Sequence, residues 1–267
     1  MGTYSLQQQV FSLALVSNAA SRHSGTVVPL EAVLTQAVES FFANAQAYIG
    51  TWAIVWGPVV TLDPTQNEAG NAMFVARGAD AVGKPVYVVA VAGTNPLSPY
   101  DVATEDFDVT LQPWPHPLPA GAAAANVSQG TLDGLQDLLQ MTDPATGTSL
   151  QAYLEGVQGS SSATLVFTGH SLGGALAPAL ALALFGGPAG GTLDASGWEA
   201  VRILPIAGPT VGDAGYSALW ASTFPPATDG SGNTWNQLVW NTLDVVPLAW
   251  AQLGGLSTLY SGIKWTA

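Results

Sequence analysis

One short segment limits the folds open to this chain more than any other feature of its sequence. A β-branched run, Thr164–Thr168, leads into Gly169-His-Ser171-Leu-Gly173, and an apolar run through Phe185 follows at once. A G-x-S-x-G pattern between a strand and a helix is typical of a sharp turn that exposes a serine at the edge of a sheet. The sequence therefore predicts an α/β fold with Ser171 as a nucleophile.

The glycines of this motif have a steric explanation. In such a turn, the residues two before and two after the serine lie too close to neighbouring backbone to carry a β-carbon. Gly169 and Gly173 meet this requirement, and Gly174 should allow close packing of the helix. The amino end of that helix favours a developing negative charge beside Ser171. In a Gly- and Ala-rich chain the five-residue pattern can arise by chance, but the strand–turn–helix setting favours the catalytic interpretation.

Strands and helices alternate from the middle of the chain onward. The expected helices are 7–20, 30–48, 132–141, 149–157, 172–185, 213–222 and 250–260, and the expected strands are 51–60, 71–78, 85–92, 164–168, 201–207 and 237–243. The nearly continuous apolar run 85–92 is typical of a strand buried on both faces of a parallel sheet. We expect one α/β domain over residues 1–267 with a mostly parallel sheet, and with N-terminal helices over about 5–50 packed outside it.

Composition excludes several classes of function. The formal net charge is −13, with only five basic residues, which argues against binding to nucleic acid and against electrostatic docking on anionic lipid. Any lipid contact would therefore have to be hydrophobic. The absence of cysteine excludes disulfides, thiolate metal sites and a cysteine nucleophile, and no His/carboxylate cluster has metal-ligand spacing. The sequence implies no cofactor, and it gives no indication of oligomeric state.

The compartment is not fixed by the sequence. The most apolar long stretch, Leu172–Phe185, is shorter than the roughly 18 to 20 residues of a membrane span. The first ten residues lack the basic region of a secretory signal. We expect a soluble protein, and secretion with a signal peptide absent from this chain is the open alternative.

The elbow also resembles that of a known family. The string Val166-Phe-Thr-Gly-His-Ser-Leu-Gly-Gly-Ala-Leu-Ala177 is similar, almost residue for residue, to the elbow of the class 3 lipases, the fungal-type triacylglycerol lipases and their bacterial relatives. Three further segments resemble this family in its own order: Val91–Thr94, Ala207–Gly212 and Asn241–Pro247. The resemblance spans roughly residues 85 to 260. It implies an α/β-hydrolase fold. It also implies an enzyme that cleaves carboxylic esters, above all acylglycerols, through an acyl-Ser171 intermediate.

A serine hydroxyl becomes a useful nucleophile only with a base, and that base needs an orienting carboxylate. In α/β-hydrolases the chain order is Ser, Asp, His. Asp244 follows the expected strand 237–243 and fits the middle role, which the resemblance also implies. Asp213 is the nearest rival, but it lies where a helix should begin, and Asp is common there for structural reasons.

The same order of elements predicts the oxyanion hole. One backbone N–H comes from the residue after the nucleophile, Leu172, and the second from the loop after an earlier strand, at Thr94. The resemblance implies that the Thr94 hydroxyl contributes as well. It also places a lid-like segment at about 95–119, a proline-rich connection whose candidate cleft-lining side chains are Leu97, Tyr100, Phe107 and Trp114.

The base is the missing part of the constellation. The three histidines are His23, His116 and His170, and none follows Asp244. His170 belongs to the elbow motif, where the family uses it structurally; His23 is expected at the surface; His116 lies in the lid-side loop, and chain order opposes its use as a base. In the resembling family the histidine comes several tens of residues after the aspartate, whereas 23 residues remain here.

Three explanations stay open. They are a chain that lacks its C-terminal segment, a separate polypeptide that supplies this segment, and a pseudoenzyme that binds a lipid or a partner without turnover. Loss of a triad member typically leaves only roughly 10³- to 10⁴-fold catalysis over water. We therefore expect this polypeptide to be weakly active or inactive. Two departures from the family pattern add to this: Pro178 should kink the helix after the elbow, and Thr210 replaces the usual arginine.

Overall fold

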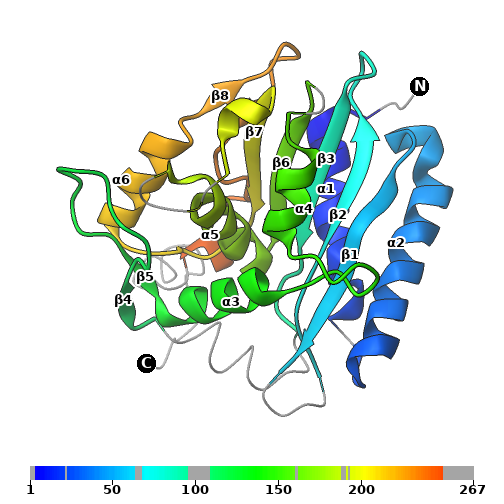
Figure 1. Cartoon of the computed structure of the whole chain (residues 1–267), viewed down its shortest axis with the longest axis horizontal. Coiled ribbons are helices and arrows are strands. Elements are labelled where there is room, and N and C mark those ends of the chain that lie inside the picture. The colour runs from blue at the N-terminus through cyan, green and yellow to red at the C-terminus, as the bar shows by residue number, and fades with distance from the viewer. Residues whose placement is uncertain are drawn as a thin grey trace.

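A computed structural model describes residues 4–21, 23–63, 68–95, 109–159, 162–187, 191 and 193–248. Its centre is a five-stranded sheet in the order β1-β2-β3-β6-β7 (Figure 1). The strands are β1 (Ala53–Leu62), β2 (Ala69–Ala79), β3 (Pro85–Val91), β6 (Thr164–His170) and β7 (Ala200–Ile206). The pairs β1–β2 and β2–β3 are antiparallel, whereas β3–β6 and β6–β7 are parallel. The parallel part of the sheet therefore begins at β3 and carries the elbow.

Helices cover both faces of this sheet (Figure 1). They are α1 (Leu6–Val16), η1 (Ser17–Ala20), α2 (Val27–Ile49), α3 (Gln129–Gln140), α4 (Leu150–Val157), α5 (Leu172–Phe185), η4 (Ala195–Gly197), α6 (Ala214–Thr223) and η5 (Val246–Leu248). Side chains of α1 and α2 share one apolar core, and those of α3 to α6 share the other. The α/β class expected from the sequence is confirmed.

Alternation along the strands explains the two cores. Val88 and Val166 face the core beneath α1 and α2, while their neighbours Val89 and Phe167 face the core beneath α5. All four side chains are fully buried, so β3 and β6 are covered on both faces. The apolar run 85–92 is thus a strand buried on both sides, as predicted.

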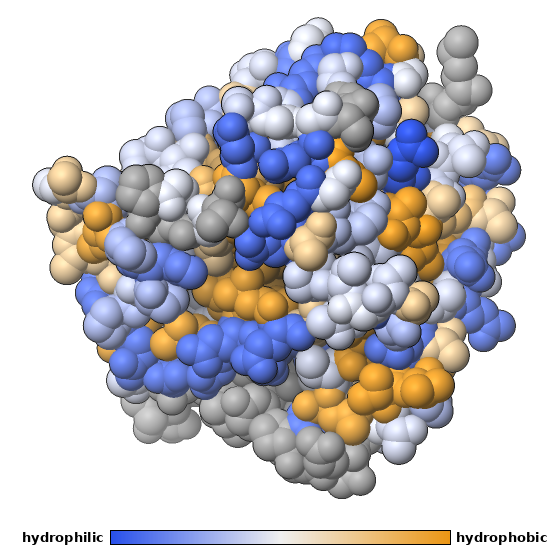
Figure 2. Space-filling view, in the orientation of Figure 1, coloured by the Kyte–Doolittle hydropathy of each residue, from blue (hydrophilic) through white to orange (hydrophobic). Residues whose placement is uncertain are grey.

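The outer face of α3 is mostly polar. On α3, Leu135 and Leu138 are buried while Gln136 and Gln140 are exposed, which is the pattern of an amphipathic helix. The space-filling view shows the resulting hydrophilic band along α3 (Figure 2). Among the described residues, none of the helices combines the length and the apolar character needed to cross a membrane.

Two short sheets lie beside the main one. β4 (Leu111–Pro113) pairs with β5 (Asn126–Ser128), and β8 (Ala227–Thr228) pairs with β9 (Thr234–Trp235), both antiparallel. β4 lies within the lid-like segment expected at 95–119, of which residues 96–108 are outside the described residues. Trp114, one of the candidate cleft-lining side chains, is buried and packs against the ring of Tyr216 at 5.5 Å between centroids.

One sequence prediction is wrong, and another concerns residues that the structure does not describe. The strand expected at 237–243 is wrong: this segment makes one parallel bridge, between Ile206 and Val239, and no ladder. Its residues Leu238, Val239 and Trp240 are exposed, so burial of their side chains does not stabilise an extended strand beside β7. The helix expected at 250–260 lies outside the described residues. α5 runs through Pro178 as one helix.

Candidate active site

The turn between β6 and α5 holds Ser171 in a strained backbone conformation. Its φ of 58° and ψ of −126° lie outside the regions that a residue with a side chain readily adopts. Two hydrogen bonds fix the turn: the Ser171 amide donates to the Ile206 carbonyl at 3.0 Å, and the Gly174 amide donates to the Ser171 carbonyl at 2.8 Å. Observed strain of this kind is typical of functional sites.

A comparison with other helix starts shows that Ser171 is not an ordinary cap. Ser5, Ser128 and Ser149 also precede helices, and each side chain accepts a hydrogen bond from its own helix. Ser171 occupies the same position before α5, yet its hydroxyl makes no such bond. The structural reason for a serine at a helix N-cap therefore does not apply at Ser171.

The glycines of the motif are required by close backbone approach, as the sequence predicted. A β-carbon added to Gly169 would lie 2.2 Å from the Gly173 carbonyl oxygen, and one added to Gly173 would lie 2.4 Å from that of Val91. Gly174 faces Gly208, whose α-carbon would lie 2.9 Å from such a β-carbon. No side chain larger than hydrogen fits at these positions without moving backbone.

The loop after β3 packs directly against the elbow. A β-carbon at Gly93 would lie 2.5 Å from the His170 carbonyl oxygen and 3.2 Å from the Ser171 β-carbon. Thr94 follows at once and is half-buried, and Leu172 is the buried first residue of α5. The structure thus brings together the two segments from which the oxyanion donors were predicted.

Asp244 lies in a tight turn before η5. Its amide donates to the Asn241 carbonyl at 2.8 Å, and its Oδ1 accepts from the Val246 amide at 3.0 Å. Val239 ties the segment to the end of β7 through bonds with Pro205 and Ala207, both shorter than 3 Å. The position of Asp244 therefore depends on a few turn contacts rather than on the predicted strand.

The charge of Asp244 reaches the residue next to the nucleophile. Burial lowers the pKa of His170, and the negative charge of Asp244 opposes this by raising it. Such an effect indicates that the two charged groups are near each other. The structure thus places Asp244 on the same side of the sheet as the elbow, although the two are far apart in sequence.

The rival carboxylate, Asp213, has a structural role. Its Oδ1 accepts from the Tyr216 amide at 2.9 Å, which caps α6, and from the Asn126 amide at 3.1 Å. Its Oδ2 accepts from the Asn126 side chain at 2.7 Å. Burial opposes ionisation, but these bonds prevail and lower the pKa of Asp213. Asp213 joins β5 to α6, as expected of a cap.

The other two histidines lie elsewhere. The ring of His116 packs on Trp114, with 5.3 Å between the ring centroids, and burial lowers the pKa of His116. His23 follows η1, where its amide donates to the Ala20 carbonyl at 3.1 Å. The contacts of the described residues thus attach His116 to Trp114 and His23 to η1, and neither of these contacts is with Ser171.

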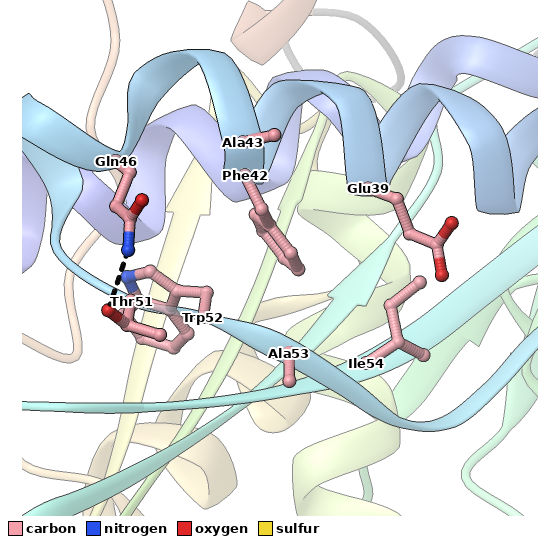
Figure 3. A pocket seen from close by; sticks show the side chains of 8 residues that line it. All are labelled: Glu39, Phe42, Ala43, Gln46, Thr51, Trp52, Ala53 and Ile54. Carbon is pink, nitrogen blue, oxygen red and sulfur yellow. Dashed lines mark hydrogen bonds between the residues drawn. The ribbon is translucent and has the colours of Figure 1, made fainter.

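Two hollows mark the surface. A groove of about 350 Å³ separates α2 from β1 (Figure 3), and its lining residues are Glu39, Phe42, Ala43, Gln46, Thr51, Trp52, Ala53 and Ile54. Ala53 is level with Arg77, Tyr87 and Leu165, near the amino ends of β3 and β6, so this groove lies at the opposite end of the sheet from Ser171. A smaller cavity of about 200 Å³ lies between α5, α6 and the 208–212 turn.

The family model for lipase (class 3) matches residues 88–252, which is more than half of the chain. The chain belongs to the lipase (class 3) family. The matched region of this class 3 lipase contains Thr94, Ser171 and Asp244. Family membership makes the protein a serine hydrolase of carboxylic esters and does not favour the pseudoenzyme alternative.

Solved structures agree with this assignment at the level of the fold. M37 lipase superimposes with a TM-score of 0.75 at 23% identity, over 98% of this class 3 lipase and 75% of that chain. Lipase II from Rhizopus niveus superimposes with a TM-score of 0.54 at 17% identity, over 95% of this chain and 76% of that one. The Rhizomucor miehei lipase–propeptide complex superimposes with a TM-score of 0.52 at 18% identity, over 90% of this chain and 62% of that one. No curated protein matches the sequence.

One part of the site was missed by sequence reasoning. Residues 17–21, expected only to pack outside the sheet, contact the loop that carries Thr94: Ser17 donates to the Val91 carbonyl at 3.1 Å, and Ser21 to the Gly93 carbonyl at 3.3 Å. Both side chains are buried. Small polar residues at the end of a helix give no sequence signal that distinguishes such a role from ordinary capping.

Proposed function

We propose that Ser171 is the nucleophile of a lipase that cleaves acylglycerols through an acyl-enzyme. The observation that carries this proposal is the strained, uncapped Ser171 with the Gly93 loop packed against its β-carbon. Attack of Oγ on the ester carbonyl transfers the hydroxyl proton to a base and forms a tetrahedral oxyanion. Collapse of that intermediate expels the alcohol, and water then releases the fatty acid from Ser171.

We assign the oxyanion hole to the backbone N–H groups of Leu172 and Thr94. Leu172 is the first residue of α5, so its amide belongs to the amino end of the helix, where donors are unpaired and a negative charge is favoured. Thr94 comes from the facing loop. Removal of one such donor typically costs about 10²- to 10³-fold in kcat.

We assign the orienting carboxylate to Asp244. It lies at the carboxyl end of the parallel strands, where α/β proteins place their sites, and its charge reaches His170 beside the nucleophile. Asp213 is excluded from this role because both of its oxygens are already engaged at the start of α6. The sequence shows no histidine after Asp244, so we expect slow turnover by the 267-residue chain.

We also propose that the protein meets lipid through apolar rather than charged surface. Trp240 and Leu243, 40% and 63% exposed, flank Asp244, and Leu238 is 39% exposed in the same segment. The protein has a formal net charge of −13, so an anionic bilayer would repel it. Contact with lipid would therefore depend on the burial of these apolar side chains. A transient contact with a neutral ester surface fits these features.

The test is labelling by a fluorophosphonate together with hydrolysis of p-nitrophenyl butyrate and palmitate. We expect labelling that disappears in Ser171→Ala, and slow hydrolysis above the rate of that variant. Rapid hydrolysis that disappears in Ser171→Ala would show that a base is present in this chain, and His116 would be replaced next. No labelling of the folded wild-type protein would overturn the assignment of Ser171.

A further inference from the structure

We propose that the side chains of Asn18 and Ser21 position the oxyanion hole. They hold the two peptide groups on either side of Gly93 and thereby orient the Thr94 N–H toward the elbow. This inference rests on the proposed function, because it gives a catalytic purpose to an N-terminal turn. Neither side chain reaches the reacting atoms, so both are positioning residues.

The first peptide group is held by Asn18. The Gly93 amide donates to the Asn18 Oδ1 at 2.5 Å, across 75 residues of sequence. Gly93 itself is buried, so without this acceptor its N–H would lose a partner in a place that water does not reach. The same bond commits the Gly93 N–H to Asn18, so this amide is not the donor that we assign to the loop.

The second peptide group is held by Ser21. Its hydroxyl, 4% exposed, donates to the Gly93 carbonyl at 3.3 Å. The Gly93 carbonyl and the Thr94 N–H belong to one planar trans peptide, in which the two bonds point in opposite directions. Ser21 therefore turns the Thr94 N–H away from the N-terminal turn by fixing the oxygen on the near side.

The elbow packs against the same glycine. From Gly93, the direction of a β-carbon meets the His170 carbonyl oxygen at 2.5 Å and the Ser171 β-carbon at 3.2 Å, with Asn18 Oδ1 at 3.3 Å. The loop is thus compressed between η1 and the turn that carries the nucleophile. Ser17 extends the attachment by one more bond, to the Val91 carbonyl at 3.1 Å.

A fixed donor matters more for the transition state than for the substrate. Oxyanion donors act because they are oriented before charge develops, so a loop free to rotate loses stabilisation of the tetrahedral state while substrate affinity changes little. A role in folding alone would instead alter stability without separating these two quantities. This difference makes the proposal testable.

The experiment compares Asn18→Ala, Ser21→Ala and Asn18→Asp with wild type, using the full 267-residue chain. Ser12→Ala is the matched control, because its hydroxyl donates only to the Gln8 carbonyl within α1. The probe is an alkylboronic acid, whose tetrahedral serine adduct places a charged oxygen in the hole. Its dissociation constant is measured beside kcat and KM for p-nitrophenyl butyrate, and amide hydrogen exchange is followed over residues 88–95.

We expect Asn18→Ala and Ser21→Ala to weaken boronic acid binding and to lower kcat by about tenfold or more, with KM within about twofold of wild type. Asn18→Asp keeps an acceptor for the Gly93 amide, so exchange at this amide should stay as slow as in wild type. Ser12→Ala should match wild type. Hydrogen exchange at the Gly93 amide should be faster in Asn18→Ala than in wild type, but not in Asn18→Asp.

Three results would overturn the proposal: binding and kcat unchanged in both alanine variants, exchange at the Gly93 amide as fast in Asn18→Asp as in Asn18→Ala, or KM and kcat altered together in proportion to lost stability. If wild type neither binds the boronic acid nor hydrolyses the ester, the assigned function fails first. Hydrogen exchange then decides on the positioning contacts themselves. Faster exchange in the Asn18→Ala and Ser21→Ala variants upholds them, and unchanged exchange refutes them.

Discussion

Gly93 and Ser171 face each other across the two loops that form the site. A β-carbon at Gly93 would lie 3.2 Å from that of Ser171, a tight contact, and 2.5 Å from the His170 carbonyl oxygen, closer than such atoms can approach. Gly93→Ala should therefore push the loop away from the elbow. We expect the rate of Ser171 labelling by a fluorophosphonate to fall by about 10²-fold, as for loss of an oxyanion donor.

The matched control for this change is Gly156→Ala. Gly156 lies in α4, where an added β-carbon meets no atom within 4 Å, so alanine should label as wild type does. It should also stabilise the helix by about 0.5–1 kcal/mol. Equal labelling of Gly93→Ala and Gly156→Ala would mean that the loop takes no part in the reaction.

Asp213→Ala should weaken folding and leave Ser171 reactive. The change removes the cap on Tyr216 and two bonds to Asn126, which should cost about 1–2 kcal/mol of unfolding free energy. Urea unfolding measures the cost, and fluorophosphonate labelling below the transition measures reactivity. A variant of unchanged stability that no longer labels would make Asp213, rather than Asp244, the carboxylate of the triad.

Asp244→Asn should lower the pKa of His170 further. Burial already lowers it, and the charge of Asp244 is the influence that raises it, so a neutral amide removes the opposing effect. An NMR titration of the imidazole in wild type and variant measures the shift, with Asp213→Asn as the comparison. An unchanged or higher pKa in Asp244→Asn would show that the two side chains are not neighbours.

The same pKa has a consequence for stability. Because the pKa of His170 is lower in the folded protein than the 6.5 of an unperturbed histidine, the unfolded chain takes up the proton first as the pH falls. The contribution is fully present above about pH 6.5 and is lost as the pH falls through the folded pKa. Asp244→Asn should therefore lose stability more steeply than wild type in this acidic range, as urea unfolding at several pH values would show.

Leu243→Ser should weaken adsorption to lipid without changing the hydrolysis of a soluble ester. Leu243 is 63% exposed and precedes Asp244 in the sequence, so its side chain is available to contact an ester surface beside the proposed site. Val82→Ser is the control: Val82 is 78% exposed in the turn before β3, at the opposite end of the sheet. Binding to neutral phosphatidylcholine vesicles measures adsorption, and an equal loss in both variants would argue against a specific surface.

The elbow was predictable from sequence because its chemistry is local. The residues that make the turn possible, Gly169, Ser171 and Gly173, lie within five positions, and the strand and helix that define its geometry adjoin them. The buried strand β3 was predictable for a similar reason, since a run of apolar residues has few other places in an α/β fold. Local steric rules and burial thus gave the fold class and the nucleophile.

The segment 237–243 shows where such reasoning fails. Its apolar, β-branched composition is typical of a strand, but a strand also needs a neighbour along its whole length, and only Val239 finds one on β7. The burial of Trp114 against Tyr216 was equally hidden, because their contact joins segments about a hundred residues apart. Pairing and packing partners are tertiary properties that composition does not encode.

The sequence by itself determined the class of fold, the candidate nucleophile and the candidate carboxylate, because each depends on residues adjacent in the chain or on a recognisable motif. Tertiary structure decided that Asp213 is a cap, that the charge of Asp244 acts on His170, and that residues 17–21 contact the loop before Thr94. The physical reason is that these roles depend on single hydrogen bonds and charges across long sequence separations. Such contacts exist only once the sheet has brought the ends of β3, β6 and β7 together.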